Sequence, residues 1–248
     1  MEQPPSLWKR CAAELIGTAL LVLIGPGTAA FLGILTAKSN QAATLADIGV
    51  VSLAFGLVVA AMIYTFGKVS GCHINPAVTV ALASVGRFSW QDVPAYIVAQ
   101  CVGGVLGSLG IVAVLGSDGA VIGNLGATVL SADTSYIRGI VIEAIEAYVL
   151  MLVIMGVAVD QRAPEGFAGL IIGLTVAGII MMTAAPTGSS FNPARTFGPY
   201  LIDSLMGGKV YWSQFPIYLI GPIAGAILAA LSYDKIAFTR SNGHSLPQ

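Results

Sequence analysis

The amino-acid sequence predicts an all-α membrane protein in which six transmembrane helices and two short half-helices form an inverted repeat. Two observations indicate this fold class. The chain is 56% hydrophobic and only 9% charged, whereas soluble proteins carry about 25% charged residues. The tripeptide Asn-Pro-Ala also occurs twice, at residues 75–77 and 192–194, each time at the start of a short apolar stretch.

Six apolar segments are long enough to be transmembrane helices, since about 20 residues cross a bilayer. Two further apolar stretches, 75–85 and 192–201, are only about 10 residues long and are too short to span. Both begin with Asn-Pro. Asparagine is a good N-cap and proline fits the first helical turn, so each stretch is expected to start a half-helix that enters the membrane and stops. The six expected spans are residues 6–35, 44–66, 92–115, 136–159, 166–184 and 211–238.

The order of these elements repeats along the chain. AELIGT (13–18) and EAIEAY (143–148) each place a glutamate early in a helix, and each is followed by a helix, a half-helix and another helix. Because each half has an odd number of spans, the second half is expected to be inserted upside down relative to the first. We expect one domain over residues 1–248, with repeats at about 6–115 and 136–238 and an extracellular linker at 116–135.

The loop charges predict the orientation of the chain. With both termini in the cytoplasm, seven Lys and Arg residues lie inside and three outside, leaving the half-helix residue Arg195 aside. This excess favours a multi-pass protein of the plasma membrane with both termini cytoplasmic. The seven residues are Lys9, Arg10, Lys68, Arg87, Arg162, Lys235 and Arg240.

Several function classes find no support in the sequence. The net charge of −1 provides no basic surface for nucleic acid. The three cysteines have no metal-type spacing, and no nucleophile stands beside a base. We therefore expect no metal, no cofactor and no enzymatic activity.

The two Asn-Pro-Ala boxes indicate a pore. Half-helices that enter from opposite faces place their N-terminal ends near the middle of the bilayer, where irregular backbone must be buried or line water. Each N-terminus carries about half a positive charge, so the facing pair disfavours cations and hydronium. The side chains of Asn75 and Asn192 offer donors to a passing oxygen atom. The segments 71–74 and 188–191 are expected to be extended, with carbonyl groups that form a ladder of acceptors. The pore-lining candidates are Gly71, Cys72, His73, Gly188 and Ser190.

Four stretches of the sequence resemble the aquaporin family of membrane channels, and the resemblance covers nearly the whole chain. It is closest to the archaeal aquaporins, through DQRAPEGFAGLIIGLTVAG (160–178). The resemblance implies a homotetramer in contact with membrane lipid, with one pore for water and small neutral solutes in each subunit. The four stretches are AELIGTALLVLIGPG (13–27), SGCHINPAVT (70–79), NPARTFGP (192–199) and GPIAGA (221–226).

The resemblance also assigns roles to individual residues. The pore boxes of the family correspond to Asn75, Pro76, Ala77, Asn192, Pro193 and Ala194. The narrow outer selectivity filter corresponds to Phe55, Ile180, Ser189 and Arg195.

Two residues depart from the patterns of the best-defined family branches. Strict water channels have a histidine where this chain has Ile180, and glycerol channels have an aspartate where this chain has Thr196. We therefore expect water as the main permeant, with slower passage of glycerol or other small neutral solutes. A secondary transporter is the alternative, because transporters also combine inverted repeats with broken helices. An ion channel is less favoured, because Arg195 and the helix N-termini oppose cations.

Four further polar or reactive residues stand out. Glu14 and Glu143 occupy matching positions in the two repeats and are expected to brace the loops before the boxes. Cys72 is expected to line the inner pore and to confer sensitivity to mercurials. Glu146 has no evident explanation, because it stands where the first repeat has Gly17 and a charge at this depth requires a partner or water.

Overall fold

The computed structural model describes residues 5–237, and all regular structure within that range is helical. Phe238 and Arg240, which the predictions for the last helix and the loop charges include, lie outside the described residues. Six helices in this part of the chain are long and apolar enough to cross a membrane, as the sequence predicts. They are α1 (Leu7–Ser39), α2 (Leu45–Ser70), α4 (Val93–Leu115), α6 (Tyr136–Ile154), α7 (Ala168–Thr187) and α9 (Phe215–Ala237).

Three of these helices extend beyond their predicted ends. The predictions stopped α1, α2 and α7 where the apolar residues give way to polar or small ones. The helices instead continue to the next residue with left-handed backbone, which is Asn40, Gly71 and Gly188 respectively. A residue of this conformation closes a helix because its N–H turns back to a carbonyl in the last turn.

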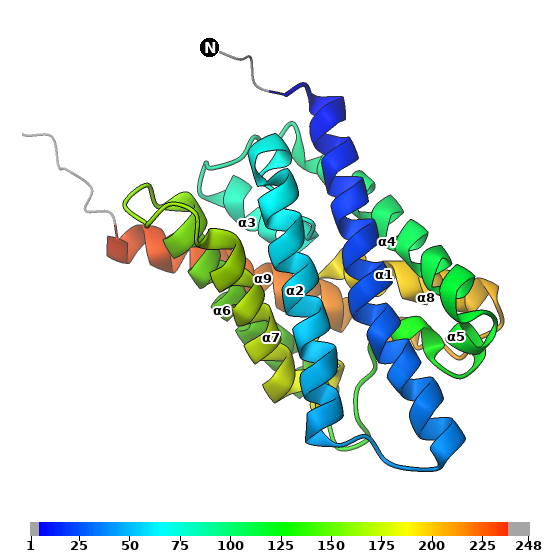
Figure 1. Ribbon diagram of the computed structural model, residues 1–248. Coiled ribbons are helices and arrows are strands. Elements are labelled where there is room, and N and C mark those ends of the chain that lie inside the picture. The colour runs from blue at the N-terminus through cyan, green and yellow to red at the C-terminus, as the bar shows by residue number, and fades with distance from the viewer. Residues whose placement is uncertain (1–4, 238–248) are drawn as a thin grey trace, which may run out of the picture.

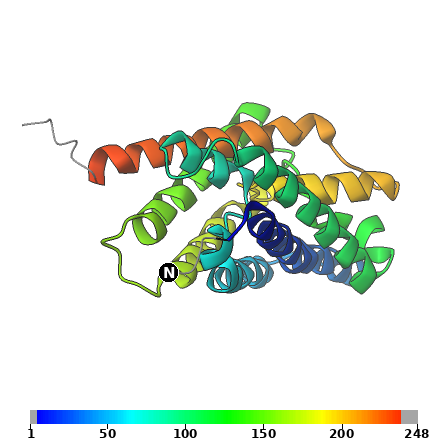
Figure 2. The same cartoon turned by 90° about the horizontal axis from the view of Figure 1, so that it is seen from above.

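The two half-helices lie where the Asn-Pro pairs predict them. They are α3 (Pro76–Ser84) and α8 (Pro193–Leu205), and the second is longer than expected. Their N-terminal ends meet near the centre of the molecule, and the two helices run away from each other (Figure 1). Seen from above, α9 crosses the molecule on the side opposite α1 and α2 (Figure 2).

The connections contain short helices that the sequence did not reveal. The linker holds α5 (Asp118–Val121) and the 3₁₀ turn η1 (Asn124–Gly126). A π-helical turn, η2 (Met155–Val159), continues α6, and another 3₁₀ turn, η3 (Trp212–Gln214), precedes α9. Such short turns have no apolar period, so hydropathy does not detect them.

Glycines let the long helices approach closely in equivalent pairs. A Cβ atom at Gly103 of α4 would collide with the carbonyl oxygen of Leu15 in α1. A Cβ at Gly225 of α9 would collide with the carbonyl of Ala144 in α6. Small residues at such crossings allow backbones to contact in a membrane, where packing holds helices together. The pairs α1–α4 and α6–α9 are equivalent elements of the two repeats.

Ion pairs show which helix ends lie at the same end of the helix bundle. Arg10 at the start of α1 contacts Asp92 at 3.0 Å, and Arg87 contacts Asp234 near the end of α9 at 3.2 Å. Lys38 at the other end of α1 contacts Asp118 of the linker at 2.8 Å. The start of α1 and the end of α9 therefore lie at one end of the helix bundle, and the linker lies at the other.

Candidate functional site

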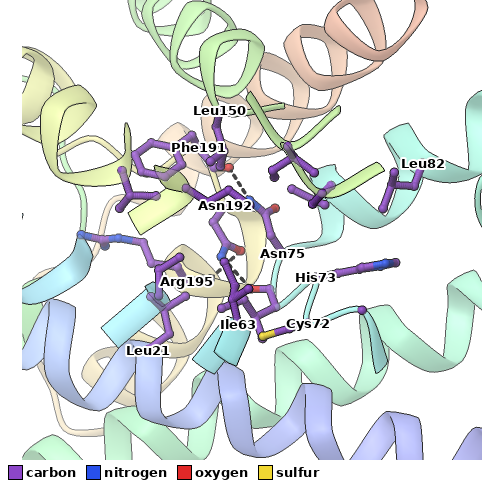
Figure 3. A pocket seen from close by; sticks show the side chains of 18 of the residues that line it. Leu21, Ile63, Cys72, His73, Asn75, Leu82, Leu150, Phe191, Asn192 and Arg195 are labelled. Carbon is purple, nitrogen blue, oxygen red and sulfur yellow. Dashed lines mark hydrogen bonds between the residues drawn. The ribbon is translucent and has the colours of Figure 1, made fainter. Parts of the chain in front are cut away.

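The two Asn-Pro-Ala boxes are joined by a reciprocal pair of hydrogen bonds. Asn75 Nδ2 donates to the backbone carbonyl of Phe191 at 2.8 Å, and Asn192 Nδ2 donates to the carbonyl of Ile74 at 2.8 Å. Each carbonyl belongs to the residue that precedes the other asparagine. Figure 3 shows the two side chains side by side at the centre of the site. The contact fixes the ends of the half-helices against each other.

The half-helices orient the asparagine amides. Asn75 Oδ1 accepts from the N–H of Ala77 at 2.9 Å, and Asn192 Oδ1 accepts from Ala194 and Arg195 at 3.1 and 3.3 Å. These are N-cap bonds, which satisfy N–H groups in the first turn of a helix. An amide nitrogen carries two hydrogens. One is used across the boxes, so each asparagine has one left for a molecule in the pore.

Two buried glutamates brace the loops before the boxes, as predicted. Glu14 accepts from the backbone N–H groups of His73 and Ile74, at 2.9 and 2.6 Å. Glu143 makes the equivalent bonds to Ser190 and Phe191, at 3.0 and 2.6 Å. Glu14 also accepts hydrogen bonds from the side chains of Ser70 and Gln100.

The prediction that these loops are extended is wrong. Gly71, Cys72 and Ile74 have φ values of 87°, 49° and 43°, in the left-handed region. Gly188, Ser189 and Phe191 repeat the pattern, at 78°, 48° and 37°. Alternation of left-handed with other residues turns successive N–H groups to one side and forms a concave anion site. The buried glutamate carboxylates occupy these sites.

The left-handed backbone costs free energy. A β-branched residue such as Ile74 rarely adopts positive φ, and such a residue costs on the order of 1–3 kcal/mol. The carboxylate of Glu14, with two backbone N–H bonds, offsets that cost. The part of this arrangement that the sequence does reveal is the glutamate early in the first helix of each repeat.

A cavity of about 370 Å³ lies on one side of the boxes. Asn75, Asn192 and Arg195 contribute polar groups to it, while most of its wall is aliphatic or aromatic. Of the sequence-predicted pore residues, those that line it are Gly71, Cys72, His73 and Ser190. His73 bonds to Thr79 through Nδ1 at 3.1 Å, and its ring points away from the asparagine pair (Figure 3).

A second cavity of about 230 Å³ lies toward the linker, and it shares Phe55 and Arg195 with the first. The Arg195 guanidinium carbon lies 5.2 Å from the centroid of the Phe55 ring. Ile180 and Gly188 line only the second cavity. An aromatic ring and a guanidinium therefore stand where the two spaces meet, beside the boxes.

The linker holds Arg195 in place. Its Nη1 donates to the carbonyl of Gly126, at 3.0 Å, in the turn η1. The sequence does not predict this contact, because a backbone carbonyl in a loop has no signature in the side-chain pattern. A Cβ at Gly126 would collide with the backbone of Pro26, so this turn sits directly on α1.

The remaining predicted site residues are buried around this path. Ser189 is 1% exposed and is not among the described residues that line either cavity. Its hydroxyl is instead turned back to Thr183 of α7, at 3.0 Å. The box residues that face the packed interior are Pro76, Ala77, Pro193 and Ala194.

Comparisons with known proteins agree with this geometry. The sequence profile of the family described as "Major intrinsic protein" matches residues 1–233. The chain is 51% identical to "Probable aquaporin AqpM" of Archaeoglobus fulgidus over 243 residues, which cover 94% of this chain and 98% of the relative. It is 49% identical to "Aquaporin AqpM" of Methanothermobacter thermautotrophicus, covering 93% and 98%. The structure of the aquaglyceroporin from Plasmodium falciparum aligns with a TM-score of 0.81 at 25% identity, covering 94% of this chain and 97% of the other.

The family match and the aquaporin relatives, together with the six spans and the facing half-helices, identify a passive membrane channel for water and small neutral solutes, not an enzyme. The chain belongs to the major intrinsic protein family, the family of the aquaporins.

Proposed function

We propose that this channel conducts water as its main permeant, passes glycerol and similar neutral solutes more slowly, and excludes protons and ions. The observation that carries the proposal is the asparagine pair. Asn75 and Asn192 each hold one amide hydrogen in a bond across the boxes and direct the other to the pore.

Proton exclusion follows from these donors and from the positive electrostatic potential of the half-helix N-termini and Arg195. A water oxygen that accepts from both asparagines has its lone pairs occupied, so it cannot accept a proton from the next water in a chain. The half-helix N-termini add positive potential at the same point. Arg195 adds a full charge beside Phe55, where the two cavities meet. Cations and hydronium therefore meet an electrostatic barrier that neutral molecules do not.

The proposed selectivity filter consists of Phe55, Ile180, Ser189 and Arg195. Ile180 presents an aliphatic side chain to the second cavity, which lies toward the linker and is called the outer cavity below. The apolar surface of Ile180 and Phe55 suits the carbon backbone of glycerol, while Arg195 donates to its hydroxyl groups. The relative described as an aquaglyceroporin supports this mixed permeability.

The assembly and orientation are part of the proposal. One channel domain over residues 1–248, with repeats at about 6–115 and 136–238, is proposed to form a homotetramer with one pore per subunit. We propose that the protein lies in the plasma membrane and that both of its termini face the cytoplasm. The pairing of α1 and α9 ends on one side supports this topology.

Stopped-flow light scattering on purified protein in liposomes tests the proposal. We expect fast water flow under a sucrose gradient, slower but protein-dependent swelling under a glycerol gradient, and no protein-dependent proton leak. Glycerol swelling equal to that of protein-free vesicles would remove the second permeant. Saturable solute flux that requires an ion gradient would indicate the transporter alternative instead.

A further inference from the structure

Glu146 is a buried acid at a position where the first repeat has no side chain. It lies on α6, one turn after Glu143, and is 1% exposed. Neither of its carboxyl oxygens makes a hydrogen bond of ordinary geometry within the described residues. Its polar neighbours are the hydroxyls of Thr183 and Ser189 and the carboxyl of Glu143.

The two repeats fill this space in opposite ways. In the first repeat, a Cβ at Gly17 would lie 2.7 Å from the Ile74 side chain and 3.8 Å from the ring of Phe66. Phe66 precedes the first box by the same number of residues as Thr183 precedes the second. A glycine faces a phenylalanine in one half, and a glutamate faces a threonine in the other. Glu146 therefore occupies volume that the small Thr183 leaves open.

The hydroxyl hydrogens around Glu146 are already committed. Thr183 Oγ1 donates its single hydrogen to the carbonyl of Ile179 at 2.6 Å. The contact of 3.0 Å between Thr183 Oγ1 and Ser189 Oγ must then use the hydrogen of Ser189. Neither hydroxyl has a hydrogen left for a carboxylate, but Ser189 Oγ retains both of its lone pairs as acceptors, whereas Thr183 Oγ1 retains one.

The charged neighbours give Glu146 no counter-ion. Glu143 on the same helix accepts from the N–H groups of Ser190 and Phe191 and, as a carboxylate, has no hydrogen to give to Glu146. Arg195 donates to Gly126 and makes no ion pair with Glu146 among the described residues. A buried carboxylate without donors is costly, whereas a carboxylic acid supplies its own hydrogen.

We propose that Glu146 is a positioning residue of the selectivity filter, which donates its carboxyl hydrogen to Ser189 Oγ and holds that hydroxyl behind the pore wall. The resulting chain runs from Glu146 to Ser189, to Thr183 and to the Ile179 carbonyl. The flanking residues Gly188 and Ser190 line the cavities, while Ser189 lines neither. The filter surface beside Ile180 is thereby kept wide and less polar, which favours glycerol.

The inference rests on the proposed filter, so its test has one arm that measures permeation and another that does not. In the first arm, the glycerol-to-water permeability ratio is measured in liposomes. In Glu146→Leu, the volume stays but one of the two proposed hydrogen bonds of Ser189 Oγ is lost, so the hydroxyl is held by Thr183 alone and turns into the pore more readily. We expect the ratio to fall about fivefold, the factor that one hydrogen bond of ordinary net strength provides.

Matched variants separate positioning from packing. Glu146→Gln retains an N–H donor and is expected to keep the parent ratio. In a Ser189→Ala background, where no hydroxyl remains to be held, Glu146→Leu is expected to change the ratio no further. Equal effects of Glu146→Leu with and without Ser189 would overturn the proposal. Thr183→Val, which removes the next link, is expected to lower the ratio even if Glu146→Leu fails to fold.

The second arm is infrared spectroscopy of the purified protein. We expect a carbonyl stretching band of a protonated carboxylic acid that is absent from Glu146→Gln and shifted in Ser189→Ala. A parent spectrum that does not differ from that of Glu146→Gln in this region would overturn the proposal. If the vesicles conduct neither water nor glycerol, the proposed function fails, and the infrared bands alone then decide whether the hydrogen bond exists.

Discussion

Asn75 and Asn192 each hold the loop that leads to the other, through amide-to-carbonyl bonds of 2.8 Å in both directions. The contact joins residues more than a hundred positions apart in the sequence, at the point where irregular backbone would otherwise leave buried carbonyl groups unpaired. The side chains therefore serve two purposes. They close the structure between the repeats, and they leave one donor each for the permeant.

Replacing Asn192 with aspartate tests both purposes. The Asp side chain still accepts from Ala194, but its second oxygen would face the Ile74 carbonyl, acceptor against acceptor. We expect a loss of about 1–3 kcal/mol of stability, measured by thermal unfolding in detergent. The added negative charge should also produce a cation leak in liposomes. Asn75→Asp is the equivalent change in the first box and is expected to have the same two effects. Parental stability and no cation leak in these variants would contradict the prediction.

The two bracing glutamates should differ in sensitivity. Glu14 accepts four hydrogen bonds, from Ser70, His73, Ile74 and Gln100. In Glu14→Gln, the new NH₂ group would confront two of these donors, each costing about 1–3 kcal/mol when left unpaired. Glu143→Gln leaves fewer donors unpaired, since Glu143 binds two backbone groups and the Thr187 hydroxyl, one donor fewer than Glu14. We expect the first variant to unfold at a lower temperature, and equal melting temperatures would refute this ranking.

Ile180 is the position at which solute size should be adjustable. Ile180→His adds a polar ring to the outer cavity beside Arg195 and narrows the opening. We expect glycerol permeability to fall several-fold more than water permeability in stopped-flow measurements, because the larger solute must pass the same opening. Ile180→Val, which is smaller and apolar, is the control and should retain or increase glycerol flow. An unchanged ratio in Ile180→His would place the filter elsewhere.

Mercurial sensitivity should depend on Cys72. This thiol lines the first cavity, the one of about 370 Å³. The other two cysteines, Cys11 and Cys101, are not among the residues described as lining either cavity. A bulky mercurial on Cys72 would block the path next to Asn75. We expect water flow of the parent to be inhibited, and Cys72→Ser to be resistant. Cys11→Ser and Cys101→Ser should remain inhibited, and inhibition of Cys72→Ser as strong as in the parent would exclude this site.

Asp160, just beyond the π-helical turn, should make stability depend on pH. Hydrogen bonds from Arg162, at 2.9 Å from both Nε and the backbone N–H, and from Tyr233 at 2.8 Å hold the pKa of this carboxyl well below its usual range. A depressed pKa stabilises the fold above the ordinary value of about 4 and loses that effect as the pH falls below it. We expect Asp160→Asn to melt below the parent at neutral pH, with the gap closing in acid. A gap that is constant with pH would contradict this.

Much of the architecture is predictable from local sequence. Long apolar runs indicate the six spans, and Asn-Pro indicates the start of α3 and α8, because both signals act within a few residues. The details of the site depend on contacts between distant backbone groups. The sequence contains no sign that Gly126 offers its carbonyl to Arg195, or that Ile74 adopts left-handed backbone. Glu146 is recognisable as unusual, but its neighbour Thr183 is identified only when the helices are packed.

The reciprocal asparagine bonds also constrain how the chain is made. When synthesis has delivered the first three spans and α3 to the bilayer, Asn75 has no Phe191 carbonyl to reach, and Ile74 has no amide to receive. The first half is therefore an incomplete product until translation reaches the second box. The asparagine pair at the centre of the conducting path is therefore completed only when the later half arrives.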